Sequence, residues 1–328
     1  MRTKETVKNR LVGLFAGVGG IETGFTQAGF EPVFANEMDK NAVITYRENY
    51  DHTLLHADLN DVPASEFPDH DILTGGFPCQ PFSIAGLKQG FNDAKGRGNV
   101  FFKIMEILKE KKTEAVLLEN VKALVTHDNG NTFKVIIQAL EDEGYYVRYQ
   151  VLNAKTHGNI PQNRERIFIV GFRNKKVAER FVFPEEIPLT VKLEDLIDFD
   201  SKMPDKYYYL PGKQRIYDAL ASGVTKKGTI YQWRVNKYVR ENKSGVAPTL
   251  TAGMGGGGNN VPLILTDHGI RKLTPRECFN LMGFPADFVL PEGMGESHLY
   301  RQAGNAVVVP VAKRIAEQVR KALDSSPQ

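Results

Sequence analysis

The sequence predicts an α/β protein with a mostly parallel sheet and a second, smaller domain. In the first half of the chain, short apolar runs alternate with segments of helical spacing, and glycines and carboxylates follow several of the runs. The expected strands are residues 11–16, 32–36, 71–75, 115–119, 147–152 and 166–172, and the expected helices are residues 20–29, 39–50, 100–111 and 131–143. Such alternation favours βαβ units. Ligands are then expected beyond the carboxyl ends of the strands.

The pattern changes after residue 174. Residues 175–270 are rich in Lys, Tyr, Gly and Pro and show weak periodicity, which predicts a smaller irregular domain. The glycine-rich stretch 253–260 is expected to be a loop. Regular patterns of apolar residues resume from residue 273, and residues 309–323 have helical spacing. We therefore expect one domain from residues 1–174 and 271–328, and another from residues 175–270.

The composition is that of an ordinary soluble globular protein and does not by itself indicate a binding partner. The 328 residues are 41% hydrophobic and 25% charged, and the net charge is only +3, so a basic nucleic-acid surface would have to be local. No apolar run reaches the roughly 18 residues that span a bilayer. The two cysteines, Cys79 and Cys278, form neither a disulfide framework nor a metal cluster, which predicts a reducing cytoplasm and no bound metal.

The stretch GGFPCQPFS, residues 75–83, places a cysteine on a stiff loop. Pro78 and Pro81 fix φ and remove two backbone donors, so Cys79 is displayed where neither helix nor strand can form. The alternative is that Cys79 is a small buried apolar residue, as free cysteines usually are. We interpret Cys278, which has apolar neighbours, as a core residue in a helix that Thr274 caps before Pro275.

A glycine turn follows the first expected strand. Gly17, Gly19 and Gly20 would let the backbone approach a ligand closely. Glu37 ends the second strand about 20 residues later, as a carboxylate that binds ribose hydroxyls does. Asp58, after a third strand, is a candidate for an adenine amino group. The dinucleotide fingerprint expects glycine where Glu22 stands, which favours a nucleoside ligand over NAD, although the turn can also be purely structural.

Two further polar groups lie at strand ends. Glu119 ends a hydrophobic strand, where a shielded carboxyl group can donate a proton or share a hydrogen bond; the alternative is a helix-capping role. Arg164 and Arg166 head another strand, and their spacing predicts that both face one side, towards a phosphate or a base carbonyl. The alternative for this pair is exposure to solvent.

Seven blocks of the sequence occur in an order typical of one family. They are FAGVGG, NE (36–37), GGFPCQPFS, ENV (119–121), QNRER (162–166), LTPRECFNLMGFP (273–285) and QAGNAV (302–307). With them the chain resembles the cytosine-C5 DNA methyltransferases of bacterial type II restriction–modification systems. The resemblance covers about residues 1–174 and 271–328 and leaves residues 175–270 as the target-recognition domain. Asp58 without a preceding glycine, Ala306 in place of serine and the extra residue Asn159 depart from the family pattern.

The resemblance implies a fold, a reaction and a set of site residues. The fold would be the Rossmann-like S-adenosylmethionine-dependent methyltransferase fold, with helices on both faces of the sheet and closed by the carboxy-terminal helix. The reaction would transfer a methyl group from S-adenosylmethionine to C5 of a flipped-out cytosine, through a covalent adduct between Cys79 and C6. The implied catalytic residues are Cys79, Glu119, Arg164 and Arg166. The implied cofactor contacts are Phe15, Ala16, Gly17, Gly19, Gly20, Glu37, Met38, Asp58, Leu59, Pro78, Asn305 and Ala306.

The partner implied by the resemblance is double-stranded DNA. Aromatic and basic residues interleave in the middle region, as on a nucleic-acid surface: Tyr231, Trp233, Arg234, Lys237, Tyr238, Arg240 and Lys243. The residues expected to contact DNA are Ser83, Arg97, Gln232, Arg234, Arg240, Thr249, Leu250, Gly255 and Gly256, and the glycine-dotted loop 80–99 is expected to close over the site. We expect a cytoplasmic monomer that pairs in function with a restriction endonuclease, recognises about four to six base pairs and protects host DNA. The alternatives are an RNA cytosine methyltransferase, a binding protein without catalysis, and an NAD-dependent dehydrogenase.

Overall fold

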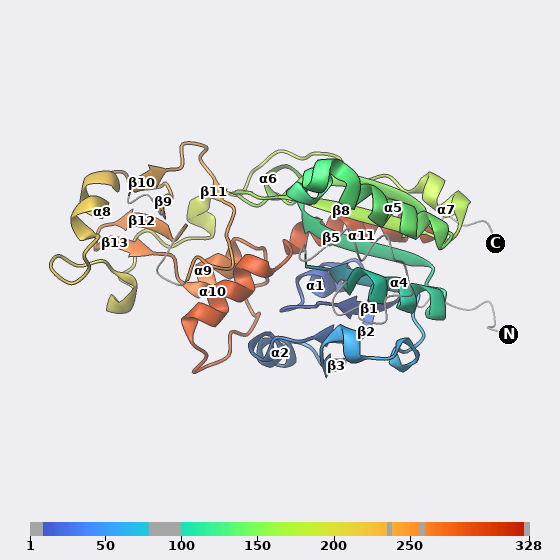
Figure 1. The fold of residues 1–328 in the computed structure, drawn as a ribbon. Coiled ribbons are helices and arrows are strands. Elements are labelled where there is room, and N and C mark those ends of the chain that lie inside the picture. Colours follow the sequence, from blue (N-terminus) through green and yellow to red (C-terminus); the bar gives the residue numbers. More distant parts are fainter. Residues whose placement is uncertain (1–8, 79–99, 235–237, 256–259, 325–328) are drawn as a thin grey trace. The chain divides into compact units, whose positions relative to one another are not determined.

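The computed structural model describes residues 9–78, 100–234, 238–255 and 260–324 of the chain (Figure 1). The chain divides into two compact units. Unit 1 comprises residues 1–152, 165–185 and 311–328, and unit 2 comprises residues 153–164 and 186–310. Each unit therefore contains segments that are distant in the sequence.

Unit 1 is built on a seven-stranded sheet with the order β3-β2-β1-β4-β5-β8-β6 (Figure 1). The strands are β1 (Arg10–Leu14), β2 (Glu31–Glu37), β3 (Thr53–His56), β4 (Ile72–Gly76), β5 (Ala115–Val121), β6 (Tyr146–Asn153) and β8 (Glu165–Phe172). The pairs β1–β2, β2–β3, β1–β4 and β4–β5 are parallel, whereas β5–β8 is antiparallel. The predicted mostly parallel sheet is thus confirmed.

Helices cover both faces of this sheet. They are α1 (Gly20–Gln27), α2 (Lys40–Arg47), α4 (Val100–Lys111), α5 (Asn131–Asp142), α7 (Lys175–Arg180) and α11 (Val309–Asp324). Apolar residues of α4 and α5 share a core with Val12, Leu73 and Leu118 of the sheet. Since side chains alternate along a strand, Gly13 faces the other side, where Glu22 of α1 lies against it.

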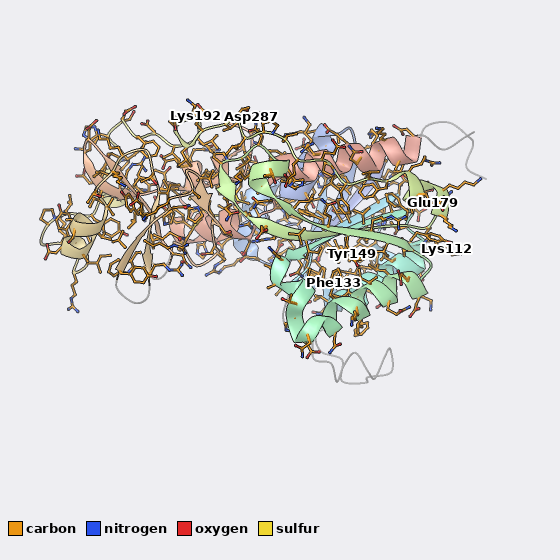
Figure 2. The ribbon with its side chains drawn as sticks, turned by 90° about the horizontal axis from the view of Figure 1, so that it is seen from above. Lys112, Phe133, Tyr149, Glu179, Lys192 and Asp287 are labelled. Atoms are coloured by element: carbon orange, nitrogen blue, oxygen red, sulfur yellow. The ribbon has the colours of Figure 1, made fainter. Side chains whose placement is uncertain are left out.

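An aromatic pair joins α5 to the edge strand β6. The rings of Phe133 and Tyr149 meet edge to face with their centroids 4.9 Å apart, and Figure 2 labels both. Phe133 is buried and Tyr149 is half exposed, so this contact covers part of the otherwise exposed strand. Edge-to-face pairs of this kind stabilise packing beyond the area that they bury.

Unit 2 contains a sheet that the weak periodicity of the middle region does not predict. Its strand order is β10-β9-β12-β13, and all three pairs are antiparallel. The strands are β9 (Tyr231–Arg234), β10 (Tyr238–Glu241), β12 (Pro262–Thr266) and β13 (Gly269–Lys272), with a separate two-stranded pair β7 (Gln162–Asn163) and β11 (Ala247–Pro248). The helices are α6 (Ala154–His157), α8 (Tyr217–Gly223), α9 (Pro275–Asn280) and α10 (Glu296–Asn305).

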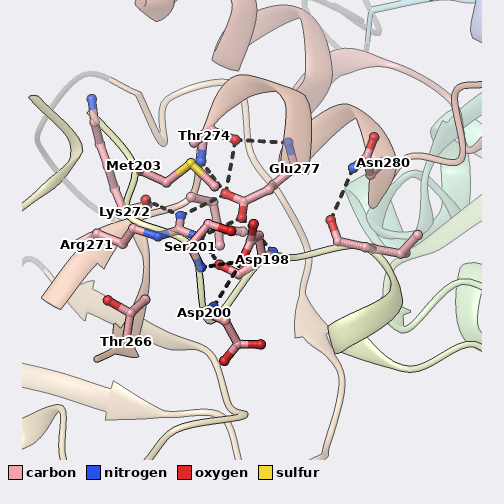
Figure 3. Close-up of polar contacts among 12 residues, drawn as sticks. Asp198, Asp200, Ser201, Met203, Thr266, Arg271, Lys272, Thr274, Glu277 and Asn280 are labelled. Carbon is pink, nitrogen blue, oxygen red and sulfur yellow. Dashed lines mark hydrogen bonds and ion pairs between the residues drawn. The ribbon is translucent and has the colours of Figure 1, made fainter. Parts of the chain in front are cut away.

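The amino terminus of α9 contains a buried ion pair that Figure 3 shows. The Thr274 hydroxyl accepts a hydrogen bond from the Glu277 amide, and the Glu277 carboxylate accepts one from the Thr274 amide. The same carboxylate binds the guanidinium of Arg271 at 2.7 and 2.8 Å, and Arg271 is fully buried. The predicted cap at Thr274 and the predicted burial of Cys278, which has 0% exposure, are confirmed.

The compact units do not coincide with the expected domain boundaries. Residues 153–164 and 271–310 belong to unit 2, although the expected domain boundaries group them with the sheet of unit 1. Conversely, residues 175–185 belong to unit 1, although they were expected in the middle domain, and residues 311–328 belong to unit 1 as expected. The division of catalysis and target recognition between these segments stays a prediction.

Candidate active site

The glycine turn joins β1 to α1 in unit 1. Phe15 and Gly17 have φ values of 51° and 56°, and Gly19, the residue before α1, has a φ of 83°. Among the described residues, and leaving aside the chain neighbours of Gly17, no atom lies within 4 Å of the position that a Cβ at Gly17 would take. This geometry leaves room beside the backbone at Gly17, and the role of Gly17 in ligand binding stays a prediction.

Glu37, the last residue of β2, is tied to this turn. One carboxylate oxygen accepts a hydrogen bond from the Gly17 amide at 2.8 Å, and the other accepts from the amides of Met38 and Asp39 at 2.8 and 2.7 Å. A carboxylate oxygen can accept two hydrogen bonds, so the oxygen that is bound only to the Gly17 amide can accept one more. The arrangement fixes the carboxylate at the edge of the sheet and leaves acceptor capacity for a ligand hydroxyl.

The other predicted cofactor residues of unit 1 differ in exposure. Met38 is 61% exposed and Leu59 is buried. Asp58 lies two residues after β3, and its carboxylate accepts a hydrogen bond from the Asn60 amide at 2.9 Å. Pro78 is exposed two residues after β4. Leu59 can therefore offer a ligand only its backbone or a small part of its side chain.

Glu119 of β5 and Arg166 of β8 form an ion pair near the carboxyl end of β4. The Arg166 Nε lies 3.1 Å from a Glu119 carboxylate oxygen, and the side chains are only 17% and 11% exposed. The other carboxylate oxygen of Glu119 lies 3.3 Å from the position of a Cβ at Gly76, so a side chain there would crowd it. The pairing of β5 with β8 brings the two charges together, although 47 positions of the sequence separate them.

Asn120 is a site residue that the sequence analysis did not single out. It is buried, and its side-chain amide donates a hydrogen bond to the Phe77 carbonyl at 2.9 Å. It thereby anchors the chain two residues before Cys79. The feature of the sequence that could have indicated Asn120 is a second polar residue, directly after Glu119, in a strand that is otherwise apolar. Cys79, Ser83, Arg97, Gly256 and the loop 80–99 lie outside the described residues.

Arg164 has different surroundings from Arg166. It belongs to unit 2, is 2% exposed, and donates hydrogen bonds to the carbonyls of Leu250, Gly304 and Ala306 at 2.8–2.9 Å. The expectation that the two arginines act as one pair on the same side is wrong, because Arg164 precedes β8 and turns into the interior of unit 2. Its hydrogen bonds are those of a residue that holds separate backbone segments together.

Four motif segments meet around Arg164. Gln162 donates to the Leu281 carbonyl at 2.7 Å and accepts from the Leu250 amide at 3.1 Å. A Cβ at Gly304 would lie 2.3 Å from the backbone of Thr251, so only glycine allows this contact. Of the predicted cofactor residues here, Asn305 is exposed and Ala306 is buried.

The predicted DNA residues of β9 and β10 share one face of unit 2. Gln232 pairs with Arg240 and Arg234 pairs with Tyr238 across the antiparallel strands, so all four side chains point to the same side. Arg240 and Tyr238 are exposed, whereas Gln232 is 6% exposed. The face therefore presents Arg240 and Tyr238 to solvent, whereas Arg234 is half-buried and donates a hydrogen bond to the Asn260 side chain.

Three residues of the middle region are more buried than a nucleic-acid surface requires. Tyr231 and Trp233 are core residues, because they lie on the opposite face of β9 from Arg234. The interpretation of these two aromatics as surface residues is wrong. Leu250 is 2% exposed and both its backbone groups are hydrogen-bonded, whereas the neighbouring Thr249 is half-buried and donates to the Asn163 carbonyl at 2.7 Å.

Gly255 has a structural reason to be glycine. A Cβ there would lie 2.5 Å from the ring of Tyr300. The absence of a side chain therefore lets Tyr300 pack against the loop, whatever else approaches it.

Within the described ranges, no cluster of three or more His, Cys, Asp or Glu side chains is arranged to hold a metal ion. In the same part of the chain, no helix has the length and apolarity needed to cross a membrane.

The sheet order and the glycine turn tied to Glu37 define the class: an α/β protein with a Rossmann-like methyltransferase fold. Solved structures share this fold. "S. pombe Dnmt2 methyltransferase" matches with a TM-score of 0.73 at 19% identity over 96% of this chain and 99% of that chain. A "putative DNA modification methyltransferase encoded within prophage Cp" from E. coli matches with a TM-score of 0.70 at 20% identity, over 96% of this chain and 99% of that chain.

Comparison of the sequence with known families is more specific. The profile of the C-5 cytosine-specific DNA methylases matches residues 9–321. Type II methyltransferase M.Bsp6I of Bacillus sp. (strain RFL6) is 56% identical over 96% of this chain and 99% of its own length. Type II methyltransferase M.SsoII of Shigella sonnei is 41% identical over 98% of this chain and 82% of its own length. The chain belongs to the C-5 cytosine-specific DNA methylase family and is a DNA (cytosine-5-)-methyltransferase.

Proposed function

We propose that this enzyme transfers the methyl group of S-adenosylmethionine to C5 of a flipped-out cytosine in a short duplex DNA site, through a covalent adduct on Cys79. The observation that carries the proposal is the pair of Glu119 and Arg166 at the carboxyl end of β5, together with the bond from Asn120 to Phe77. These contacts bring a carboxylate and a guanidinium to the end of the sheet from which the Cys79 segment leaves.

The residues around the glycine turn fit S-adenosylmethionine. The space at Gly17 allows a close approach of the ligand, and the Glu37 carboxylate oxygen that is bound to the Gly17 amide retains acceptor capacity for a ribose hydroxyl. We assign Asp58 to the adenine amino group, and Asn305 and Ala306 to the methionine part. When bound, S-adenosylmethionine would supply an electrophilic methyl group on its sulfonium; transfer of this group to C5 would break its bond to sulfur and leave S-adenosylhomocysteine as the product.

The protein's own part in the chemistry begins at Cys79. Its thiolate adds to C6, which breaks the C5–C6 π bond and turns C5 into the nucleophilic carbon of an enamine. Glu119 would hydrogen-bond N3 and the exocyclic amine and so stabilise the adduct, while Arg166 would hold O2. After methylation, C5 loses its proton to water, and elimination of the thiolate restores the aromatic ring and Cys79.

Arg164 has a different part in this proposal. Because its guanidinium binds three carbonyls inside unit 2, we assign it the positioning of the QAGNAV segment rather than contact with the base. This assignment accounts for an arginine that has 2% exposure.

We infer that the substrate is duplex DNA and that target recognition lies in unit 2. C6 of a stacked cytosine is out of reach, so the base must leave the helix. Arg234 and Arg240 on the exposed face of β9 and β10 are suited to phosphates or base edges, and membership of a DNA methylase family supports DNA over RNA. The names of the relatives support a type II restriction–modification role, in which a cytoplasmic monomer protects host DNA from a partner endonuclease.

The decisive experiment uses the two cysteines as a matched pair. Cys79→Ser should lose methyl transfer to duplex DNA by at least about 1,000-fold, because the hydroxyl is a far weaker nucleophile, while it still binds DNA. Cys278→Ser changes the buried cysteine and should retain transfer. Tritiated methyl incorporation into duplex DNA and into tRNA measures both variants.

Substantial turnover by Cys79→Ser would remove the covalent step, and incorporation only into tRNA would refute the DNA substrate. Bisulfite sequencing of a host that expresses the enzyme should reveal methylated cytosines in one short motif of about four to six base pairs. Methylation scattered without a common sequence would contradict the proposed target recognition.

A further inference from the structure

The two glycines that flank Val18 in the glycine turn have different reasons to lack a side chain. Among the described residues, nothing lies within 4 Å of a Cβ position at Gly17, whereas a Cβ at Gly19 would lie 2.3 Å from both the ring carbon Cζ and the hydroxyl oxygen of Tyr50. Tyr50 follows α2 and packs directly under the turn. The sequence analysis assigned both glycines to the ligand, but the space at Gly19 belongs to Tyr50.

The hydroxyl of Tyr50 also binds the backbone of the turn. It donates to the Gly19 carbonyl at 2.8 Å and lies 2.5 Å from the hydroxyl of Thr23 in α1. The Thr23 hydroxyl in turn lies 2.8 Å from the same carbonyl. Two side chains from different elements thus converge on one peptide group, immediately before the first residue of α1.

The ring of Tyr50 is held in place from the other side. Its centroid lies 4.3 Å from that of Tyr46 in α2, and 5.7 Å from that of His52. The hydroxyl of Tyr46 is hydrogen-bonded to His52 Nε2 at 2.7 Å and not to the glycine turn. Burial raises the pKa of the Tyr50 phenol, so the hydroxyl remains a donor at neutral pH.

We propose that Tyr50 and Thr23 are positioning residues that hold the turn 17–19 in its left-handed conformation for cofactor binding. This inference rests on the proposed function, since it assumes that the turn receives S-adenosylmethionine. A glycine samples positive and negative φ with similar ease. Without the two hydroxyls the turn would therefore populate other conformations, and the ligand would bind only the fraction that is correctly formed.

The test compares two phenol hydroxyls of the same cluster in the full-length enzyme. Tyr50→Phe keeps the ring under Gly19 and removes the bond to the turn. Tyr46→Phe removes a buried hydroxyl that does not contact the turn. We expect Tyr50→Phe to weaken S-adenosylmethionine binding about tenfold by isothermal titration, and to raise its KM with kcat nearly unchanged at saturation. Tyr46→Phe should leave both values within about twofold.

Thr23 provides a second pair of variants. Thr23→Val removes the hydroxyl at nearly constant shape and should weaken S-adenosylmethionine binding, whereas Thr23→Ser keeps the hydroxyl and should restore affinity. If Thr23→Ser binds S-adenosylmethionine as the wild type does, the hydroxyl of Thr23 positions the turn and its methyl group is not needed.

The inference and the proposed function fail in different ways. If the wild-type enzyme binds no S-adenosylmethionine, the proposed function is wrong. If the wild type binds it and Tyr50→Phe binds it equally well, the inference is wrong. An equal loss of affinity in Tyr50→Phe and Tyr46→Phe also overturns the inference, since it would indicate general destabilisation of the cluster.

Discussion

Glu22 is a carboxyl group with almost no access to solvent, at the start of α1. Its exposed fraction is 1%, and one of its oxygens lies so close to Gly13 that a Cβ there would be 1.9 Å away. Burial, together with the nearby charge of Glu37, raises the pKa of Glu22 to about 8. The group is therefore mostly protonated at neutral pH, and a side chain at Gly13 would displace its carboxyl end.

This shift makes the stability of the fold depend on pH. The ordinary pKa is 4.5, so the folded state holds a proton that the unfolded state releases between about pH 4.5 and 8. The stabilisation is fully present below pH 4.5 and is lost as the pH rises to about 8. Glu22→Gln replaces the neutral acid with a neutral amide and should raise the Tm relative to wild type more at pH 9 than at pH 5.

Thermal unfolding of both proteins between pH 5 and 9 measures this difference. The matched control is Glu31→Gln, which changes an exposed carboxylate at the start of β2. Its Tm difference from wild type should be nearly constant over the same range. A pH-independent difference for Glu22→Gln would contradict the assignment of a protonated Glu22.

At the scale of the element, α9 shows how a short helix is fixed at its first turn. Thr274 and Pro275 begin the helix, and Glu277 completes a capping box. Glu277 also binds Arg271 of β13 and accepts a hydrogen bond from the Asp198 amide at 3.0 Å. One carboxylate thus joins a helix, a strand and a loop of unit 2.

Glu277→Gln should therefore destabilise the protein strongly. Removing one partner of a buried ion pair leaves the other charge without compensation, which costs about 3–5 kcal/mol. The control Glu165→Gln breaks the exposed pair with Lys122, whose side chains are 42% and 56% exposed, and should cost less than about 1 kcal/mol. Urea unfolding measures the free energy of unfolding of both variants. Equal losses would mean that the buried ion pair stabilises the protein no more than the surface pair does.

At the scale of the whole molecule, unit 1 depends on the end of the chain. Its third segment contains most of α11, where the Arg320 guanidinium donates to the carbonyls of Ala28 and Gly29 just after α1. Arg180 of α7 donates in turn to the Ala322 carbonyl at 3.0 Å. The last helix therefore ties together α1 and α7, which are far apart in the sequence.

Removing residues 311–328 should abolish S-adenosylmethionine binding, because α1 and its glycine turn lose this support. Truncation after Asp324 retains α11 and should bind normally. Isothermal titration with the cofactor, with circular dichroism to follow folding, measures both. Retained affinity after the longer truncation would show that unit 1 does not need α11.

Local patterns account for much of unit 1. Most of its strands are short apolar runs, and helices such as α4 carry a stripe of helical spacing, so the strands and helices that were expected lie within about three residues of their predicted positions. No bounds were predicted for the short strand β3, and the helix α7 was not predicted. The cap at Thr274 and the burial of Cys278 were predicted for the same reason, because both depend on neighbouring residues. The antiparallel sheet of unit 2 was missed, since its strands are only four or five residues long and interrupted by polar residues.

The sequence by itself determined the family, the strand ends at which polar groups gather, and the helices that cover the sheet. Only the tertiary structure decided which of those groups meet. It paired Arg166 with Glu119, turned Arg164 towards three carbonyls, and placed the Tyr50 ring where a side chain at Gly19 would stand. The physical reason is that periodicity and turn chemistry act over a few residues, whereas a partner across a sheet or under a turn is set by packing between segments that are distant in the chain.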